Sequence, residues 1–423
     1  MRLTRVLAGV LAAGMLTACG GGDDGGDGDG DGGKGGGFVG GSSGGEGGGA
    51  PEAQLKVPAL YDTSRGWESD LRATQHPLPH SDAVGMFVAE PRQFTVLDVT
   101  SGDPLWTSEV LRSPSEDMRY ESLSATAGGK DYLVAWATGT TEGDVVSKGS
   151  EITTIDIFPA EGSGEGVKPA RHVELEGEGF VSDGGGGLMV KQQDGDVFVT
   201  VDLATGATEE YDLYEVEPPE SECNLCGVLS EMQGVTAGGP LLWNEGLGSD
   251  TALWVPDGWT GAEVEADARP TPSLILEDVL VAQWRAKGAT HITWGALDSA
   301  TGEVRAEVLC EPEGGLGGFQ AEDDPALSAN GQYLVRGNVV FDMQQGAGHC
   351  FEETDTDKPV VFNGVTDTGL AFGQAPDTNV VVDIATGKVE ASKHRVVPFA
   401  DFAGHGLFWD EENSTMVVYP HAG

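Results

Sequence analysis

From about residue 51 to the C-terminus, short apolar runs alternate with turn residues along the chain. The runs are rich in β-branched and aromatic residues, and Gly, Asp, Asn and Pro separate them. This texture is typical of short strands joined by tight turns, and no sustained 3.6-residue periodicity accompanies it. The pattern therefore predicts an all-β domain over residues 51–423.

A two-part repeat recurs in this region at intervals of roughly 40–50 residues, close to the length of one four-stranded propeller blade. The first part is an apolar strand, and the second is a strand followed by an acidic residue and a turn that ends in Gly. In such a turn the Asp accepts hydrogen bonds from nearby backbone N–H groups, and the Gly adopts a positive φ. The clearest copies of the second part are Val96–Gly102, Val201–Gly206, Ala296–Gly302 and Val382–Gly387.

One copy, from Leu97 to Trp106, resembles the repeat of PQQ-like β-propellers, in which a Trp packs each blade against the next. In most other copies Val304, Val389 or Glu209 replaces this Trp. The resemblance implies a single β-propeller of about eight four-stranded blades. Seven blades is the alternative, because residues 232–267 are irregular.

The two ends of the domain are predicted to pair. The last apolar strand, around Leu407 to Tyr419, reaches the C-terminus without a following Asp-turn-Gly, whereas Tyr61–Trp67 near the start copies that turn and its Trp. We therefore expect an N-terminal strand to complete the C-terminal blade. Such closure removes exposed strand edges from a propeller.

Residues 1–18 have the pattern of a lipoprotein signal peptide. Arg2 and Arg5 precede an apolar run that is too short to span a bilayer. The run ends in Leu16-Thr17-Ala18-Cys19, which resembles a bacterial lipobox and implies a diacylglycerol on the Cys19 thiol. Two acyl chains anchor a protein stably, so we expect a lipid anchor on the extracytoplasmic face of a cell membrane. Cleavage elsewhere, as in an ordinary signal peptide, is the alternative.

Residues 19–50 are almost wholly Gly, Asp and Ser after the cysteine, and are predicted to form a disordered tether. The whole chain has a formal net charge of −46. Such a charge repels nucleic acid and anionic lipid headgroups, so we expect no nucleic-acid partner. Cations, basic protein patches and neutral ligands stay open as partners.

Four further cysteines, Cys223, Cys226, Cys310 and Cys350, follow Cys19. An even number of cysteines in an exported chain predicts disulfides, and four cysteines allow three pairings. We favour Cys223–Cys226 with Cys310–Cys350, because each pair then lies within or between neighbouring repeats. A redox CxxC requires a thioredoxin-like context, and a zinc site requires further ligands at finger spacing, and the sequence shows neither.

The sequence assigns no catalytic, cofactor or metal residue. Quinoprotein dehydrogenases, which the repeats resemble, carry adjacent cysteines and a calcium-binding carboxylate cluster that have no match here. His76 and His80 stand four apart, but the two prolines between them exclude a helix that would bring them together. Aromatic and histidine residues such as Trp243, Trp254, Trp259 and His405 either line a sugar platform or pack within the blades.

The expected function is therefore that of a membrane-anchored extracytoplasmic interaction or ligand-binding module, with contacts made by the blade loops. The alternative is an extracytoplasmic hydrolase or oxidoreductase with a site in the central channel.

Overall fold

The structure, a computed structural model, describes residues 49–423 except 70, 72, 113–117, 142–148, 194, 217–229, 245–251, 257, 265–269, 287, 312–324, 353–357 and 393–395. Cys19, the predicted signal peptide and almost all of the predicted tether lie outside the described residues, as do Cys223 and Cys226. The described residues belong to one compact unit by their contacts.

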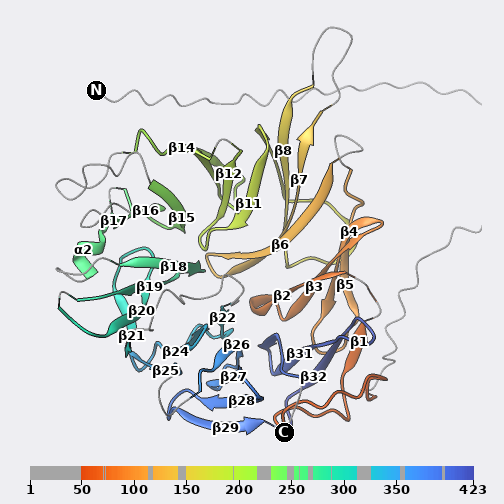
Figure 1. Ribbon diagram of the computed structural model, residues 1–423. Coiled ribbons are helices and arrows are strands. Elements are labelled where there is room, and N and C mark those ends of the chain that lie inside the picture. Colours follow the sequence, from red (N-terminus) through yellow and green to blue (C-terminus); the bar gives the residue numbers. More distant parts are fainter. Residues whose placement is uncertain are drawn as a thin grey trace, which may run out of the picture. The chain divides into compact units, whose positions relative to one another are not determined.

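The described chain is all-β, as predicted (Figure 1). Its helical elements are the 3₁₀ turn η1 (Pro79–Ser81) and the single-turn helix α2 (Gly261–Val264). No helix among the described residues is long and apolar enough to cross a membrane.

The strands follow one another along the chain as antiparallel groups, each of four strands except for the three-stranded β15–β17 group. The first four groups are β2 (Thr74–Leu78), β3 (Ala83–Ala89), β4 (Arg92–Asp98) and β5 (Pro104–Ser108); β6 (Arg119–Ala127), β7 (Lys130–Thr140), β8 (Glu151–Pro159) and β10 (Arg171–Glu176); β11 (Gly179–Asp183), β12 (Leu188–Gln192), β13 (Val197–Val201) and β14 (Thr208–Asp212); and β15 (Ser230–Thr236), β16 (Gly239–Asn244) and β17 (Ala252–Trp254).

The later groups repeat the same antiparallel order. They are β18 (Thr271–Leu276), β19 (Val279–Trp284), β20 (Ile292–Asp298) and β21 (Val304–Cys310); β22 (Ala326–Leu327), β23 (Tyr333–Arg336), β24 (Val339–Asp342) and β25 (Ala347–Cys350); β26 (Val361–Val365), β27 (Leu370–Ala375), β28 (Thr378–Asp383) and β29 (Lys388–Ser392); and β30 (Ala400–Phe402), β31 (His405–Asp410), β32 (Thr415–Pro420) and β1 (Trp67–Ser69).

Two short parallel pairings connect neighbouring groups at their outer strands. The strand β9 (Gly164–Val167) pairs with β5 of the preceding group, with Trp106 opposite Gly164. Strand β21 pairs with β25 through Glu307 and Ala347, so that two groups merge into one eight-stranded sheet.

The two ends of the domain pair as the sequence predicts. Strand β1 runs antiparallel to β32, with Trp67 opposite Val418, and Tyr61 forms an isolated bridge with His421. The first strand of the described chain therefore completes the sheet of the last group, and it covers the outer edge that β32 would otherwise expose.

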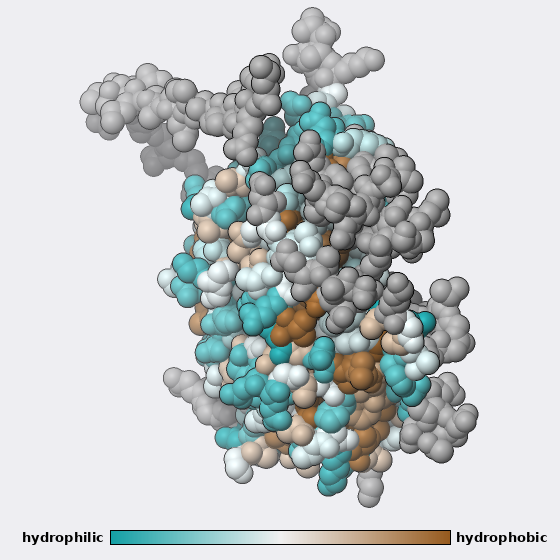
Figure 2. Space-filling model, turned by 90° about the vertical axis from the view of Figure 1, so that its left-hand side faces the viewer, coloured by the Kyte–Doolittle hydropathy of each residue, from teal (hydrophilic) through white to brown (hydrophobic). Residues whose placement is uncertain are grey.

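On the face of the molecule that Figure 2 shows, hydrophilic side chains are interspersed with hydrophobic ones. The buried hydrophobic core is divided among the groups in a regular way. Eight of the clusters of buried side chains in the described chain each join two consecutive groups, from the β2–β5 and β6–β10 groups onward. The eighth of these clusters joins the last group to the first, because Trp67, Leu407 and Val418 pack with Val84 and Leu97. The groups are thus linked in a closed cycle, which Figure 1 shows as sheets following one another about a common centre.

The Asp-turn-Gly motif has the local structure that the sequence predicts. Asp98 Oδ1 accepts hydrogen bonds from the backbone N–H groups of Thr100 (2.9 Å) and Ser101 (2.8 Å), and Gly102 has a φ of +75°. A Cβ atom at Gly102 would lie 2.6 Å from the Trp67 ring, so the absence of a side chain lets the indole of the preceding group lie on this turn. The Trp67 Nε1–H also donates to Val99 O at 2.8 Å.

Two more tryptophans dock on the next group in a similar way. Trp106 Nε1–H donates to Ala160 O at 2.8 Å, and Trp259 Nε1–H donates to Ser299 O at 3.0 Å. The Trp259 ring lies against Gly302, as Trp67 lies against Gly102. Trp259 stands outside the sequence motif, so its docking role was not predicted.

Candidate functional site

A groove of about 670 Å³ lies between the β11–β14 group and the β15–β17 group. One wall is formed by β13, β14 and the turn between them, and the other by the β15–β16 turn and Pro256. Polar side chains dominate the first wall, while small residues dominate the second. The polar members are Thr200, Asp202, Thr208, Glu209 and Tyr211.

Strand register explains why this interface between two groups is open. In the β11–β14 group Thr200 pairs with Glu209, and in the β2–β5 group Val96 pairs with Trp106. Thr200 and Val96 are equivalent positions, because each lies two residues before the Asp of its turn. Glu209 therefore occupies the position that Trp106 has in its own group. Trp106 is 1% exposed and fills the space toward the next group, whereas the Glu209 side chain is exposed. Among the described residues, no side chain fills the corresponding space at the interface that lacks the docking Trp.

Tyr211 lies beside Glu209 on the same wall, because alternate residues of a strand point to the same face. Burial raises the pKa of the Tyr211 phenol, and its hydrogen bond with the Glu209 carboxylate raises the pKa further. The phenol therefore stays protonated near neutral pH and donates to Glu209. Below these residues, Phe198 and Trp254 belong to the buried cluster that joins the two groups.

The Asp202 carboxylate stabilises a turn in the same wall. Its Oδ1 accepts from the backbone N–H and the hydroxyl of Thr205, both at 2.7 Å, and these hydrogen bonds lower the pKa of Asp202. The carboxyl side chains of Asp202 and Glu209 thus border the groove. None of the described side chains that line it is a Lys, Arg or His, so these residues give the groove a negative potential.

The opposite wall is a turn with little side-chain bulk. Thr236 Oγ1 donates to Gly239 O at 2.9 Å and accepts from the Gly238 N–H at 3.1 Å, which fixes the turn. A Cβ atom built at Gly239 would meet no other atom within 4 Å. At Gly239 the backbone of this turn is therefore not covered by described residues, and a ligand can approach it closely.

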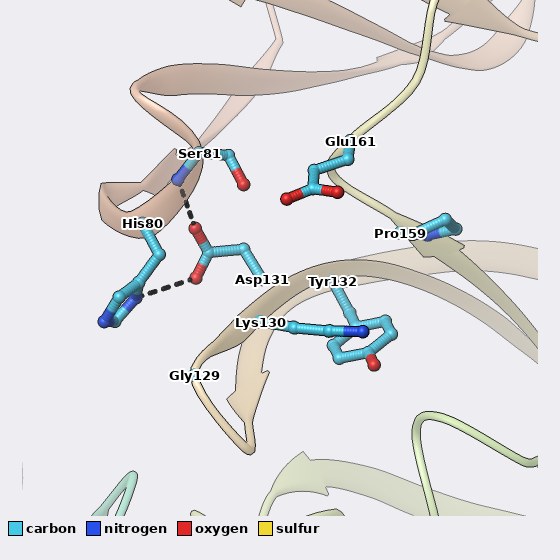
Figure 3. A pocket seen from close by; sticks show the side chains of 8 residues that line it. All are labelled: His80, Ser81, Gly129, Lys130, Asp131, Tyr132, Pro159 and Glu161. Atoms are coloured by element: carbon cyan, nitrogen blue, oxygen red, sulfur yellow. Dashed lines mark hydrogen bonds and ion pairs between the residues drawn. The ribbon is translucent and has the colours of Figure 1, made fainter.

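A second, smaller pocket of about 250 Å³ lies where η1 meets the β6–β7 turn (Figure 3). The buried carboxylate of Asp131 accepts from the Ser81 N–H at 2.9 Å and the Thr126 hydroxyl at 2.9 Å, and it lies 3.2 Å from His80 Nδ1. Figure 3 shows the Ser81 hydroxyl on the side of Glu161, away from the His80 ring. This is not the arrangement of a nucleophile and its general base. Asp131 instead ties η1 to the next group.

The two histidines that the sequence places four residues apart do not converge. His76 is 7% exposed and its Nε2 lies 2.9 Å from Ser122 Oγ, while His80 turns to Asp131. Burial lowers the pKa of His76 to about 4, so this imidazole is neutral near neutral pH.

Acidic side chains from separate groups gather near this second pocket. Burial raises the pKa of Asp183, at the end of β11, to about 6, although the Gly185 N–H donates to it at 2.9 Å. Burial also raises the pKa of Glu277, in the β18–β19 turn; His80 opposes that rise, and Asp278, Asp131 and Asp183 add to it. No pattern in the sequence predicts this convergence, because these residues come from four different groups.

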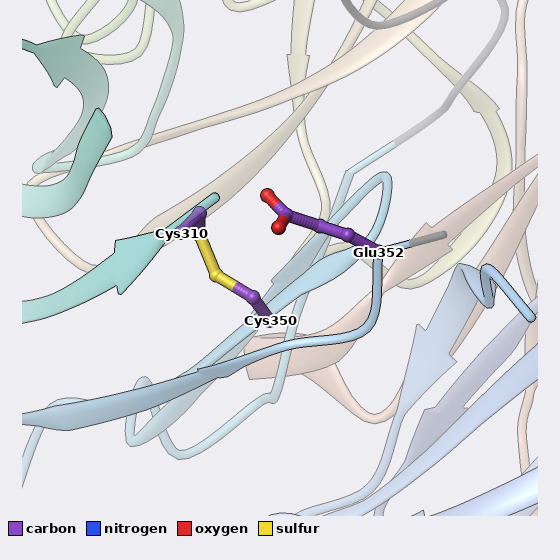
Figure 4. Close-up of side chains that lie close together, drawn as sticks. All are labelled: Cys310, Cys350 and Glu352. Atoms are coloured by element: carbon purple, nitrogen blue, oxygen red, sulfur yellow. A yellow bond between two sulfur atoms is a disulfide. The ribbon is translucent and has the colours of Figure 1, made fainter. Parts of the chain in front are cut away.

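The predicted disulfide between Cys310 and Cys350 is present and joins the outer strands β21 and β25 of two groups (Figure 4). Their Cα atoms are 5.8 Å apart. The Glu352 carboxylate lies close to the two sulfurs and accepts from the Glu311 N–H at 2.9 Å. Bonded to each other, the sulfurs serve as a cross-link between groups. Cys223 and Cys226, predicted to form the other disulfide, lie outside the described residues.

The aromatic residues weighed as a sugar platform pack inside the protein. Trp254 and Trp259 are 1% and 4% exposed, which leaves no ring face for a sugar. Trp243 is half-buried against the Trp259 cluster, and half-buried His405 is held by its own turn through Ala403 O at 2.8 Å. Of the residues that border the groove, the sequence singles out Glu209, as a repeat position where Glu replaces the Trp.

No family model matches the chain, and no curated protein matches it. Among solved structures, the chain is similar to dipeptidyl peptidase 4 of Porphyromonas gingivalis, with 11% identity, 79% of this chain and 56% of that chain covered, and a TM-score of 0.43. The chain thus spans little more than half of that peptidase. It is also similar to Hsv2 of Kluyveromyces lactis, with 10% identity, 82% and 98% of the chains covered, and a TM-score of 0.32. Similarities at this level carry no conclusion about the function of this chain.

Proposed function

We propose that this protein is a membrane-anchored extracytoplasmic β-propeller lipoprotein, and that it acts as an interaction or ligand-binding module. The propeller would have eight blades, one for each strand group, with the β15–β17 group as the irregular blade. The closed cycle of shared hydrophobic clusters and the pairing of β1 with β32 support a single ring.

The proposed anchor rests on the sequence. Leu16-Thr17-Ala18-Cys19 supplies the acylation motif, and the Gly- and Asp-rich segment up to residue 50 supplies reach between the membrane and the domain. An anchored domain of this kind meets partners at the cell surface, where a large negative charge favours basic partners over anionic ones.

The observation that carries a binding role is the groove beside Glu209. Its volume of about 670 Å³ falls within the usual range of ligand sites, roughly 300–1,000 Å³. It exists because a polar residue replaces the Trp that closes another interface in the same domain. The alternative of an enzyme has no comparable support. The Asp131 carboxylate beside His80 accepts a hydrogen bond from the Ser81 backbone N–H and so stabilises the η1 turn.

The test is site-specific photo-crosslinking in intact cell envelopes. With p-benzoylphenylalanine in place of Tyr211, we expect a crosslinked product that disappears when Glu209→Trp fills the groove. Tyr214, which is 57% exposed and does not line the groove, is the matched control position. Equal crosslinking from both positions, or crosslinking that survives Glu209→Trp, would contradict a binding role for the groove.

A further inference from the structure

We propose that the groove between the β11–β14 and β15–β17 groups recognises an arginine side chain carried by an extended peptide segment of a partner, with Glu209 as the anionic contact. This inference rests on the proposed function of the groove as a binding site, and it adds the chemical class of the ligand.

Glu209 is the carboxylate of the groove that is available to a cation. Among the described residues it has no salt bridge, and its Tyr211 neighbour is a neutral phenol. Asp202, by contrast, is occupied by its turn. An exposed carboxylate in a negatively charged concavity attracts a positive group more strongly than the same carboxylate on an open surface.

The described cations near the groove have contacts of their own, and the charge of Arg171 also acts on Asp202 of the groove wall. The stem of Arg171 lies over Gly206, and its Nη1 donates to Ala170 O at 2.6 Å. The Lys191 ammonium lies over the Phe198 ring, 5.6 Å from its centroid. Neither residue lines the groove. No cation of the described part of the chain therefore pairs with Glu209, and a cation of a partner can do so.

The pairing of Glu209 with Tyr211 favours a guanidinium over an ammonium. A guanidinium offers parallel N–H donors that match the two oxygens of a carboxylate, and its planar face stacks on an aromatic ring. Cation–π contact with a ring adds to the attraction. Tyr211 supplies the ring and Glu209 the carboxylate, two residues apart on one face of β14.

The size of the groove and its second wall point to a peptide rather than a single small cation. A volume of about 670 Å³ exceeds what one arginine side chain fills. The wall opposite Glu209 is the fixed Ala237–Gly239 turn, which presents backbone with little side chain. A peptide main chain can approach such a wall closely. The net charge of −46 on the whole chain also speeds the encounter with a basic partner.

The experiment measures binding of acetyl-Ala-Arg-Ala-amide to the purified full chain in detergent at low salt by ligand-observed NMR. The control peptide carries citrulline, which keeps the shape of arginine but has no charge. We expect saturable binding of the arginine peptide, and a Kd at least roughly tenfold weaker for citrulline, the loss typical of a charge-assisted hydrogen bond. Glu209→Gln should weaken the arginine peptide by a similar factor.

A matched variant separates this contact from general charge attraction. Glu210→Gln removes the same charge one residue away, on the opposite face of β14, and should change the Kd by less than about twofold. Equal losses in Glu209→Gln and Glu210→Gln would overturn the inference, as would the absence of saturable binding.

The same experiment distinguishes a failure of this inference from a failure of the proposed function. If both peptides bind equally well and Glu209→Trp abolishes both, the groove binds ligands without selecting a guanidinium. The inference then fails while the proposed function stands. If the arginine peptide binds selectively but Glu209→Trp leaves its Kd unchanged, the cation binds outside the groove, and the inference fails as well.

Discussion

Truncating Trp67 tests how the two ends of the domain hold each other. The side chain is 2% exposed and packs among Val84 and Leu97 of the first group and Leu407 of the last. Its Nε1–H donates to Val99 O at 2.8 Å, and its ring lies on the turn at Gly102. Trp67→Ala removes contacts in both groups at once, so it weakens the junction that closes the cycle.

The magnitude follows from the buried surface. A Trp side chain buries about 150–250 Å², and at about 25 cal/mol per Å² its loss costs roughly 4–6 kcal/mol. Large-to-small substitutions of buried aromatic residues cost about 3–5 kcal/mol. Losing the donor to Val99 O adds about 1 kcal/mol. We therefore expect Trp67→Ala to lower the free energy of unfolding by about 4–6 kcal/mol.

The assay is equilibrium urea unfolding followed by circular dichroism, which does not depend on tryptophan emission. Tyr214→Ala is the matched control, because this aromatic residue is 57% exposed and its loss should cost less than about 0.5 kcal/mol. A second variant that lacks residues 51–69 should expose the edge of β32 and aggregate, whereas removal of residues 20–48 should leave the melting temperature unchanged. A loss below about 1 kcal/mol for Trp67→Ala would refute the closure at this junction.

Three further predictions concern the anchor, the disulfide and a buried acid. Cys19→Ser should move the protein from the detergent phase to the aqueous phase in a partitioning assay, and identical partitioning of both forms would contradict the lipid anchor. Replacing Cys310 and Cys350 together by Ala should lower the free energy of unfolding by about 4 kcal/mol, the entropy of a loop with a sequence separation of 40; a loss under about 1 kcal/mol would show that the cycle already provides this restraint. Because burial raises the pKa of Asp183 to about 6, the folded state binds its proton more tightly than the unfolded state does, so stability is lost as pH rises from about 4 through 6. Asp183→Asn should therefore gain up to roughly 3 kcal/mol over wild type at pH 7.5 and nothing at pH 4, and a pH-independent difference in urea unfolding would contradict the shift.

The features that depend on short stretches of chain could be predicted from the amino-acid sequence. Strand positions follow from runs of a few apolar residues, and the turn at Asp98 follows from hydrogen bonds to backbone groups two and three residues on. The pairing of the two ends was also predictable, because Tyr61–Trp67 copies a motif that the last repeat lacks. Cys310 and Cys350 paired as their positions in neighbouring repeats suggested.

How neighbouring groups fill the space between them depends on contacts between distant parts of the chain, which the sequence pattern does not predict. The docking of Trp259 on Gly302 depends on a loop outside the repeat motif, and the convergence of Asp131, Asp183 and Glu277 depends on how distant turns meet. Glu209 is the clearest example. In the sequence it stands at the repeat position that Trp106 occupies in another copy. Whether this difference creates a cavity depends on whether side chains from the next group fill the space. The described side chains of that group do not fill it, because the group presents a turn of small residues there, and the position without Trp borders a groove with an exposed carboxylate.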